Sequence, residues 1–336
     1  MGNYKKVFIT GAAGFIGSHL TKKLLQEGLE VGILKREQSN VWRIKDVLDK
    51  IRVFNADLRD NYKISKIISD FGPDIVFHLA TYYAVGHTSG EIVPMIESNV
   101  LGTVNLLEAS KESAGLFVNT SSSFVYKEST SKLRENSPLS PFNLYALTKI
   151  QAEQACTFYA ETYGLKTVTF RIFPPYGPGD HERRLVPYTI NSLLNGDRPK
   201  MTTGNQRWDF IFVDDIVAAY LSSLSVSDLP NKHEVINVGT GIAVSVREVV
   251  MMIRDIIGCE IEPDWGVIPH RDNEIWSLFA DTKKARMLLG WRSSTPLKTG
   301  LVLTVKWFEK ILEQKKRMQG GAIEGADKSF NEDTDE

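Results

Sequence analysis

The sequence has few of the residues that mark a secreted, metal-binding or membrane protein. Its only two cysteines, Cys156 and Cys259, lie far apart, which suits a reducing compartment and small packing side chains. Six histidines are scattered without ligand spacing, so we predict no metal. No segment approaches roughly 18 uninterrupted apolar residues, and no signal-peptide pattern precedes the first strand. These absences predict a soluble, cytoplasmic protein without a membrane partner.

The sequence also lacks an excess of either positive or negative charge. The chain has 40 basic and 41 acidic residues among 336, a formal charge of −1, so nothing in its composition calls for nucleic acid. A hydrophobic content of 42% supports a sizeable core, and the length suits about two domains or one domain with an appended lobe. From residue 314 onward apolar residues are too few to pack, which predicts a disordered tail over 314–336.

A glycine-rich turn follows the first predicted strand, Val7 to Thr10. Gly11, Gly14 and Gly17 are spaced by three residues, and an apolar-periodic helix comes next. In such a turn the first glycine permits the bend, the second lets backbone approach a pyrophosphate, and the third lets helix and strand pack closely. Because strand, turn and helix form one unit, we favour a dinucleotide site over a turn without a ligand.

Predicted strands alternate with amphipathic helices along the first half of the chain, which predicts a doubly wound, parallel α/β sheet. Two long helices are expected, at about 92–113 and 143–163. Beyond residue 176 the pattern is less regular and indicates a smaller, interwoven lobe. The expected division is a dinucleotide-binding domain over 1–175, completed by about 209–238, and a substrate-binding lobe formed by 176–208 and 239–313.

Tyr145 and Lys149 are four residues apart on the second long helix, so both side chains lie on one face. A nearby ammonium lowers a tyrosine pKa from about 10 toward neutrality, which suits general acid and base catalysis. The same pair is common on solvated helix faces. Its position after the hydroxyl cluster Ser121 to Ser123, and behind a dinucleotide turn, favours catalysis.

Together these motifs resemble the extended short-chain dehydrogenase/reductase family, specifically its nucleotide-sugar epimerases, dehydratases and reductases. The resemblance implies a Rossmann-type sheet and a homodimer formed through the two long helices, whose outer faces could equally pack within one monomer. It covers nearly all of residues 5–312 and rests on motifs in the family's order: Gly11 to Gly17, Asp57-Leu58, His78-Leu79-Ala80, Asn99 with Gly102-Thr103, Thr120 to Tyr126, Tyr145 with Lys149, Tyr176-Gly177-Pro178, Asp209 to Asp215, Asn237-Val238-Gly239 and Leu289-Gly290-Trp291.

The resemblance also implies roles for individual residues. Tyr145 would exchange the proton at the reacting sugar oxygen, Lys149 would hold the nicotinamide ribose, and Ser122 would hydrogen-bond the substrate. Asp57 would accept from the adenine amino group, although a loop acid that bonds backbone amides is the alternative. The expected cofactor contacts are Gly11, Gly14, Phe15, Ile16, Gly17, Lys35, Arg36, Asp57, Leu58, Leu79, Ala80, Asn99, Tyr145 and Lys149. The expected substrate contacts are Tyr83, Ser122, Ser123, Arg207 and Arg271.

Two departures from the family pattern restrict the chemistry. The dehydratases place an acidic pair after the catalytic hydroxyl, where this chain has Ser123-Phe124, so 4,6-dehydration is disfavoured. The acid that bonds an NAD ribose is replaced by Lys35-Arg36, and a basic pair suits a 2′-phosphate. We therefore favour NADP(H), with NAD(H) possible. A solvated surface pair is the alternative, and Glu37 weakens the local positive field.

A third departure concerns the sugar diphosphate. Pro174 and Trp208 stand where family members often have asparagine and arginine, and Arg207 is one residue away, which on a strand points to the opposite face. Arg271 matches the family's second phosphate arginine, whose fork suits a diphosphate. We therefore still expect a nucleotide-sugar substrate.

The leading prediction is an NADPH-dependent reductase of a nucleoside-diphosphate 4-keto-6-deoxysugar in deoxysugar biosynthesis. Hydride would be delivered to C4 and Tyr145 would act as general acid, because a net reductase consumes NADPH whereas an epimerase retains NAD. The alternatives are a nucleotide-sugar 4-epimerase with the same triad, a reductase of a non-nucleotide carbonyl, and a catalytically silent cofactor-sensing binding protein.

Overall fold

The computed structural model describes residues 4–84, 86–225 and 230–326. The chain divides into a larger unit, Met1–Tyr176, Asn205–Val246 and His270–Thr295, and a smaller unit, Gly177–Gly204, Arg247–Pro269 and Pro296–Glu336. The two are interwoven along the chain. Segment 270–295 falls in the larger unit, where its strand β12 (Ser277–Leu278) pairs with β8 (Arg207–Trp208). The expected assignment of 239–313 to a substrate-binding lobe stays a prediction.

A seven-stranded parallel sheet forms the centre of the larger unit, in the order β10-β6-β5-β4-β1-β2-β3. The strand order reverses between β1 and β4, the position at which doubly wound sheets bind ligands. The predicted fold class is thereby confirmed. The strands are β1 (Lys6–Thr10), β2 (Glu30–Lys35), β3 (Arg52–Asn55), β4 (Ile75–His78), β5 (Leu116–Ser122), β6 (Thr167–Ile172) and β10 (His233–Val238).

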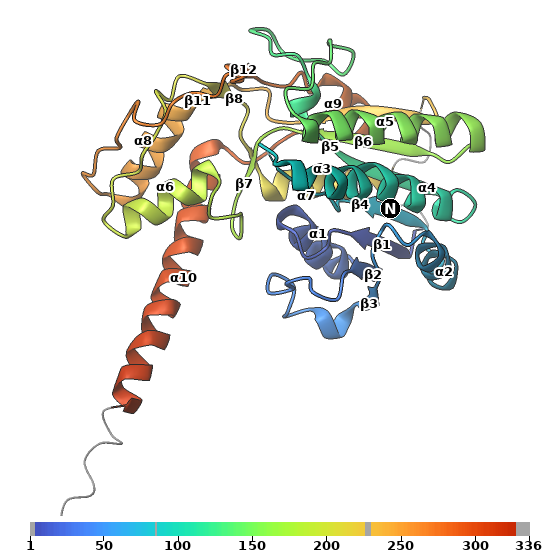
Figure 1. Ribbon diagram of the computed structural model, residues 1–336, viewed down its shortest axis with the longest axis horizontal. Helices are drawn as coiled ribbons and strands as arrows, with labels where there is room; N and C mark the ends of the chain where they lie inside the picture. The colour runs from blue at the N-terminus through green and yellow to red at the C-terminus, as the bar shows by residue number, and fades with distance from the viewer. Residues whose placement is uncertain (1–3, 85, 226–229, 327–336) are drawn as a thin grey trace, which may run out of the picture. The chain divides into compact units, whose positions relative to one another are not determined.

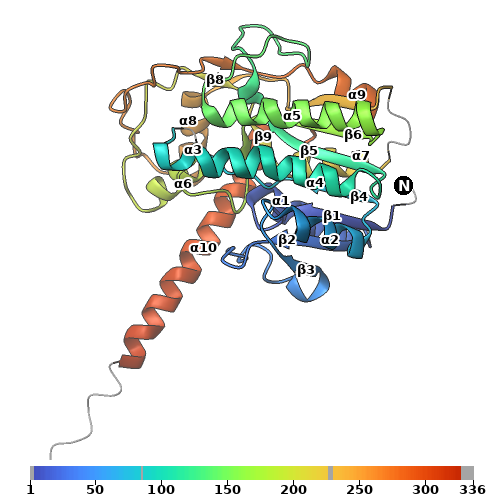
Figure 2. The same cartoon turned by 45° about the vertical axis from the view of Figure 1, so that its right-hand side comes forward.

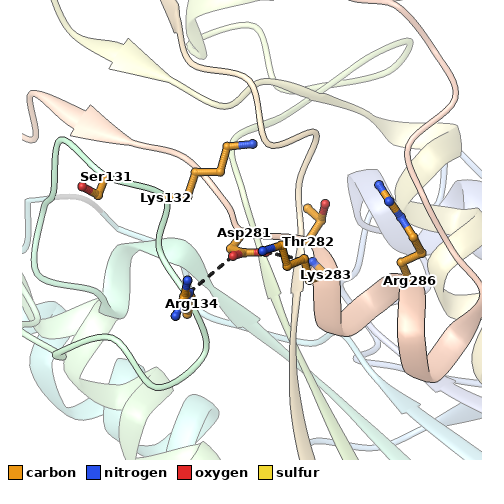
Figure 3. Close-up of a pocket in the computed structure, with 7 residues that line it drawn as sticks. All are labelled: Ser131, Lys132, Arg134, Asp281, Thr282, Lys283 and Arg286. Atoms are coloured by element: carbon orange, nitrogen blue, oxygen red, sulfur yellow. Dashed lines mark hydrogen bonds and ion pairs between the residues drawn. The ribbon is translucent and has the colours of Figure 1, made fainter.

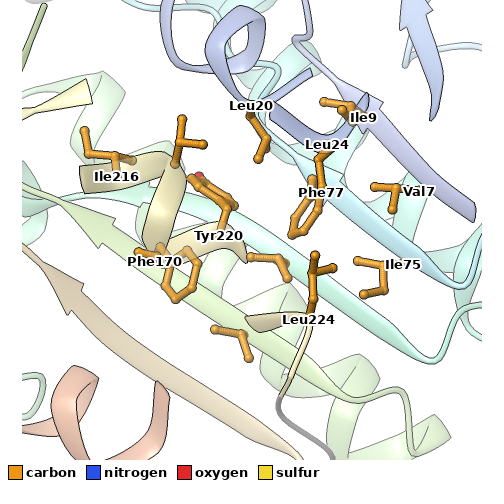
Figure 4. Close-up of a cluster of buried hydrophobic side chains, with 14 of the residues drawn as sticks. Val7, Ile9, Leu20, Leu24, Ile75, Phe77, Phe170, Ile216, Tyr220 and Leu224 are labelled. Carbon is orange, nitrogen blue, oxygen red and sulfur yellow. The ribbon is translucent and has the colours of Figure 1, made fainter. Parts of the chain in front are cut away.

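Helices cover both faces of this sheet (Figures 1 and 2). One face packs against α1 (Phe15–Gln26), α7 (Val213–Ser223) and α9 (Lys283–Leu289). The other packs against α2 (Asn61–Phe71), α4 (Gly102–Ser110) and α5 (Leu144–Tyr163). Alternation along the strands divides the two cores: Val7 and Ile9 face α1 (Figure 4), and Phe8 faces α2. Burying each such side chain contributes roughly 1.5–3 kcal/mol.

The first predicted long helix is interrupted. The structure has α3 (Ser89–Ile96), a π-helical turn η2 (Glu97–Leu101) and then α4, which run beside α5. Such a turn inserts about one residue and shifts the apolar register only once. A single shift within a short helix does not stand out from ordinary irregularity in the hydrophobic pattern. The second long helix starts where predicted, since the Asn143 side chain caps it by accepting from the Ala146 amide at 2.8 Å.

Shorter elements complete the larger unit. Three strands form a small sheet in the order β11-β8-β12, and β7 pairs with β9. The remaining elements are β7 (Pro175–Tyr176), β9 (Ile211–Phe212), β11 (Val244–Ser245), and the 3₁₀ turns η1 (Leu48–Lys50) and η3 (Ser123–Val125).

The smaller unit contains α6 (Leu185–Leu194), most of α8 (Val246–Ile257) and α10 (Leu297–Ala326). Residues 314–326 continue α10, and 327–336 lie outside the described residues, so the disorder expected over 314–336 stays a prediction. Among the α10 side chains that the structure describes, up to residue 317, Phe308 is the last buried one, and beyond it Arg317 forms an i,i+4 ion pair with Glu313 at 3.9 Å. Over the described residues, no helix is long and apolar enough to span a membrane.

Candidate active site

The glycine turn after β1 leaves no room for side chains. Gly11 has φ +74°, and a Cβ there would lie 2.6 Å from both the Ala80 nitrogen and the Leu79 carbonyl carbon. A Cβ at Gly17 would lie 2.1 Å from the Gly11 oxygen. The turn therefore packs directly against the end of β4 and against the first turn of α1, which brings two of the predicted cofactor segments together.

The amino end of α1 meets the requirement for a dinucleotide phosphate. Its N-cap is Gly14, which has no side chain to satisfy the first amides, and the helix begins with Phe15 and Ile16. Backbone N–H groups at a helix start, with the positive end of the helix dipole behind them, bind phosphate. A Cβ at Gly14 would lie 3.0 Å from the Gly11 oxygen, so the residues present fit a dinucleotide.

The ends of β2 and β3 carry the predicted adenosine contacts. Lys35 is half-buried at the end of β2, and Arg36 is exposed beside it. Both oxygens of Asp57 accept from Arg59: Oδ1 from the backbone nitrogen at 3.0 Å and Nε at 2.9 Å, and Oδ2 from Nη2 at 3.0 Å. The hydrogen bonds from Arg59 lower the pKa of Asp57, and the charge of Arg36 contributes. Leu58 is buried.

Sequence reasoning missed two arginines beside these contacts. Arg59 links Asp57 to Glu97, whose Oε2 accepts from Arg59 Nη1 at 2.9 Å. Arg43 lies 4.4 Å from the centre of the Trp42 ring, and its Nη1 donates to the carbonyl oxygen of Ala13, within the glycine turn, at 3.5 Å. No motif marks either residue, because the contact of Arg59 with Glu97 and that of Arg43 with Ala13 join segments 38 and 30 residues apart in the sequence.

Asn99 lies buried in the π-helical turn, and its amide is bonded to protein atoms. Its Oδ1 accepts from the Tyr82 nitrogen at 2.6 Å and from the Thr81 hydroxyl at 3.1 Å. Its Nδ2 donates to the Tyr82 oxygen and to the Thr148 hydroxyl, both at 3.0 Å. Asn99 therefore fixes the segment after β4 against α5, so its predicted contact with a cofactor remains a prediction.

Tyr145 and Lys149 lie together on α5, beside the end of β5. Lys149 Nζ is 5.7 Å from the centre of the Tyr145 ring and donates to the Thr120 carbonyl oxygen at 2.9 Å. Burial lowers the pKa of Lys149 to about 8, opposed by the charge of Glu153. Two residues after Thr120, the buried Ser122 uses its Oγ to accept from the Phe124 nitrogen at 3.2 Å. All three predicted catalytic residues therefore border one strand end.

The predicted substrate contacts differ in exposure. Tyr83 is 48% exposed and packs edge-on against Tyr145, with ring centres 4.9 Å apart. Ser123 is 1% exposed. Next to it, Phe124 packs against Phe142 with ring centres 5.2 Å apart, so at the position of the dehydratases' acid this chain has a hydrophobic contact.

A buried ion pair supports the catalytic helix from behind. Glu153 Oε1 accepts from Arg171 Nε at 3.0 Å and from the Ser121 hydroxyl at 2.5 Å, while Oε2 accepts from Arg171 Nη2 at 2.6 Å. Arg171 also lies over the Tyr126 ring, 4.7 Å from its centre. This network joins α5, β5 and β6, and the spacing of Glu153 four residues after Lys149 was the only local signal for it.

The predicted phosphate arginines are both exposed. On β8, Arg207 Nη2 donates to the Ala243 oxygen at 2.8 Å, whereas the half-buried Trp208 donates from Nε1 to the Ile275 oxygen at 2.9 Å. Arg271 follows at the start of the 270–295 segment. Within the described ranges, no group of three or more histidine, cysteine or acidic residues is placed to hold a metal ion.

The sheet order, the glycine turn and the tyrosine–lysine pair together define an NAD(P)-dependent oxidoreductase of the extended short-chain dehydrogenase/reductase type. Residues 7–239 match the model of the NAD dependent epimerase/dehydratase family. The chain belongs to this family, and the resemblance inferred from its motifs is confirmed.

Relatives with assigned activities lie within the same family. CDP-abequose synthase of Salmonella typhimurium is 31% identical over 309 residues, 88% of this chain and 95% of that protein. UDP-glucose 4-epimerase of Thermotoga maritima, solved with UDP-glucose, has a TM-score of 0.84 and 28% identity over 91% of this chain and 99% of its own. UDP-glucuronic acid 4-epimerase of Bacillus cereus, solved with UDP-glucuronic acid and NAD, has a TM-score of 0.82 and 26% identity over 91% and 99%.

Proposed function

We propose that this protein is an NADPH-dependent reductase that acts at C4 of a nucleoside-diphosphate 4-keto-6-deoxysugar. The observation that carries the proposal is the pairing, in one sheet, of Tyr145 and Lys149 at the end of β5 with a basic pair, Lys35 and Arg36, at the end of β2. The first pair supplies an acid for a carbonyl oxygen, and the second suits a 2′-phosphate.

In the proposed mechanism the protein's groups handle the proton. The bound nicotinamide would supply hydride to C4. The Tyr145 hydroxyl gives its proton to the C4 oxygen as charge develops there, and the buried ammonium of Lys149 stabilises the phenolate that remains. The Ser122 oxygen accepts from the Phe124 amide, so its O–H remains to donate to the substrate oxygen. Phe124 and Phe142 form an apolar ring contact beside this strand end.

The preference for NADP is argued from the charges at the carboxyl end of β2. Lys35 and Arg36 have no acidic side chain of the described chain bonded to them, and Lys35 Nζ donates only to the Arg36 carbonyl oxygen, at 3.4 Å. Asp57, on which the charge of Arg36 acts, is already bonded to Arg59. The basic pair is therefore available to an external phosphate, and Arg43 beside the glycine turn can add a further positive charge.

A nucleotide-sugar 4-epimerase is the second candidate, favoured by the comparisons. Both solved neighbours described above carry that activity in their names, and one was solved with NAD. The catalytic residues would be the same, with Tyr145 acting first as base and then as acid. CDP-abequose synthase, by contrast, is a relative of comparable identity whose name denotes formation of a nucleotide sugar. The two candidates differ in whether cofactor is consumed.

A homodimer through α3, η2 and α5 forms part of the proposal. Large apolar side chains on these elements are 40–59% exposed, although Phe158 also packs against Tyr159 and Tyr163 of the same chain. Packing within one monomer is the alternative drawn from the sequence. Exposed hydrophobic groups gathered on adjacent helices favour association. They are Val93, Ile96, Leu101, Leu147 and Phe158.

The decisive experiment follows NADPH absorbance with a panel of nucleoside-diphosphate 4-keto-6-deoxysugars. A reductase oxidises NADPH stoichiometrically with one of them, and the product keeps the new hydrogen at C4. Interconversion of a UDP-hexose pair without added cofactor, and no NADPH oxidation with any ketosugar, would assign the epimerase instead. Reduction of simple carbonyls alone would indicate a non-nucleotide substrate, and cofactor binding without turnover would indicate a silent sensor.

A further inference from the structure

A cavity of about 570 Å³ lies in the larger unit, and none of the predicted cofactor or substrate residues lines it. Figure 3 shows its walls: one is the loop that follows η3, and the other is the segment that leads into α9. Its volume falls within the range of small-molecule sites. The lining residues are Ser131, Lys132, Arg134, Asp281, Thr282, Lys283 and Arg286.

Positive charge dominates the lining. Four of its side chains are basic and one is acidic. The acid, Asp281, forms an ion pair with Arg134 at 3.4 Å, and no carboxylate in the described part of the chain pairs with Lys132, Lys283 or Arg286. The whole protein has a formal charge of −1, so this cluster does not reflect a generally basic surface. Three neighbouring cations without counter-charges repel one another, and a bound anion would relieve that repulsion.

Hydroxyl groups stand among the cations. A Cβ built on Gly241 would lie 3.4 Å from Lys132 Nζ and 3.9 Å from Thr282 Oγ1, so these two polar atoms approach one point on the cavity wall. Ser131, next to Lys132 in the chain, is also a lining residue. Ammonium, guanidinium and hydroxyl donors are the groups that bind phosphate oxygens. The one carboxylate of the lining, Asp281, is already bonded to Arg134 and to the Lys283 backbone nitrogen.

Backbone hydrogen bonds fix the two walls to each other. The Leu133 amide donates to the Phe279 oxygen at 2.9 Å, and the Asp281 amide donates to the Leu133 oxygen at 2.7 Å. Asn237 Nδ2, from β10, also donates to the Leu133 oxygen at 2.8 Å. The backbone of the two walls is therefore fixed before any ligand binds, which limits the entropy lost by the chain on binding. The side chains of Lys132, Lys283 and Arg286 themselves are exposed.

We propose that this cavity is a second ligand site, which binds a small anion with at least two phosphate charges, such as a diphosphate group. A single monoanion would neutralise only part of the three uncompensated charges. The concave wall and limited volume favour a small molecule over an extended polymer backbone. Free pyrophosphate and the diphosphate of a nucleotide share this chemistry.

The test measures binding of pyrophosphate, and separately of UDP and CDP, by titration calorimetry at fixed ionic strength. The variants are Lys132→Glu and Arg286→Glu, with Lys132→Gln and Arg286→Gln as milder partners in case charge reversal disturbs folding. Because a charge-assisted hydrogen bond is lost in each, the affinity for pyrophosphate should fall by about tenfold or more. Lys66→Glu, an exposed change on α2, is the matched control and should bind as the wild type does.

The outcomes separate the possibilities. Weaker binding of pyrophosphate in the cavity variants alone supports the site. If UDP or CDP also binds more weakly in them, the natural source is a nucleotide, and otherwise it is free pyrophosphate. Equal pyrophosphate affinity in the wild type and all variants, or no saturable binding by the wild type, overturns the proposal. None of these variants touches the Tyr145 site, so the result is independent of the proposed reductase activity.

Discussion

Lys149 donates a hydrogen bond from Nζ to the carbonyl oxygen of Thr120, across 2.9 Å. This contact fixes the Lys149 ammonium to the carboxyl end of β5. The charge lies 5.7 Å from the centre of the Tyr145 ring. Burial removes water from the Lys149 ammonium, which lowers its pKa to about 8. The catalytic helix and the strand that carries Ser122 are thereby held in one arrangement.

Replacing Tyr145 by phenylalanine should lower kcat by about a hundredfold or more, because general acid catalysis contributes roughly 10²–10⁴. Binding of NADPH should change little, since the ring remains. Steady-state kinetics and a cofactor titration would test this. Tyr159→Phe is the matched control on the same helix, where the hydroxyl donates to Glu108 instead, and should retain activity. A fully active Tyr145→Phe enzyme would exclude Tyr145 as the acid.

Lys35→Asp should shift cofactor preference toward NADH. A carboxylate at the end of β2 would repel a 2′-phosphate and accept from a ribose hydroxyl. The ratio of kcat/KM for NADPH to that for NADH should fall by about tenfold or more, the effect of one charge-assisted contact. Lys66→Asp, on the exposed face of α2, serves as the control. An unchanged ratio in Lys35→Asp would refute the role of this residue.

Glu153→Gln should destabilise the protein strongly. It removes the charge that compensates the buried Arg171, and breaking a buried ion pair costs about 3–5 kcal/mol in the free energy of unfolding. Urea denaturation would measure the loss. For comparison, Glu27→Gln removes a surface ion pair with Lys23 at 2.7 Å and should cost less than about 1 kcal/mol. Similar losses in the two variants would show that the buried ion pair contributes no more to the free energy of unfolding than the surface pair does.

The pKa of Lys149 predicts a pH effect on stability. Folded, this lysine releases its proton near pH 8, whereas its ordinary value is 10.5. Between these values the unfolded chain binds more protons, so the contribution of Lys149 to the free energy of unfolding rises with pH, by about 1.4 kcal/mol per pH unit. Relative to wild type, Lys149→Met should lose this rise between pH 8 and 10.5. If the free energy of unfolding changed with pH in the same way for the wild type and Lys149→Met, this prediction would be contradicted.

Charge placed on the exposed face of α5 should dissociate the proposed homodimer. Leu147 is 40% exposed and Phe158 is 52% exposed, and burying a carboxylate against an apolar partner surface is strongly unfavourable. Analytical ultracentrifugation of Leu147→Glu and Phe158→Glu should therefore report monomers where the wild type is a dimer. Met287→Glu alters an equally large exposed side chain on α9 and should leave the dimer intact. A wild-type monomer would refute the interface outright.

The amino-acid sequence by itself determined the doubly wound sheet, the glycine turn and the tyrosine–lysine pair. Each depends on spacing within one short segment: strand alternation, glycines three residues apart, and two side chains one helical turn apart. The interruption of the helix around Asn99 was not predictable, because a single π-helical turn shifts the apolar register only once and is not distinguishable from ordinary irregularity in a short helix.

Only the tertiary structure decided the contacts that make these segments into a site. Thr120 contacts Lys149, Arg171 contacts Glu153, and Ala80 packs against Gly11 because β1, β4, β5 and β6 are neighbours in the sheet. In the chain, β2 and β3 come between β1 and β4. Hydrophobic burial fixes that order, and no local pattern encodes which strand ends become neighbours. The basic residues around the proposed anion cavity likewise come from two segments that are distant in the sequence. Backbone pairing between Leu133 and Ala280 joins these segments.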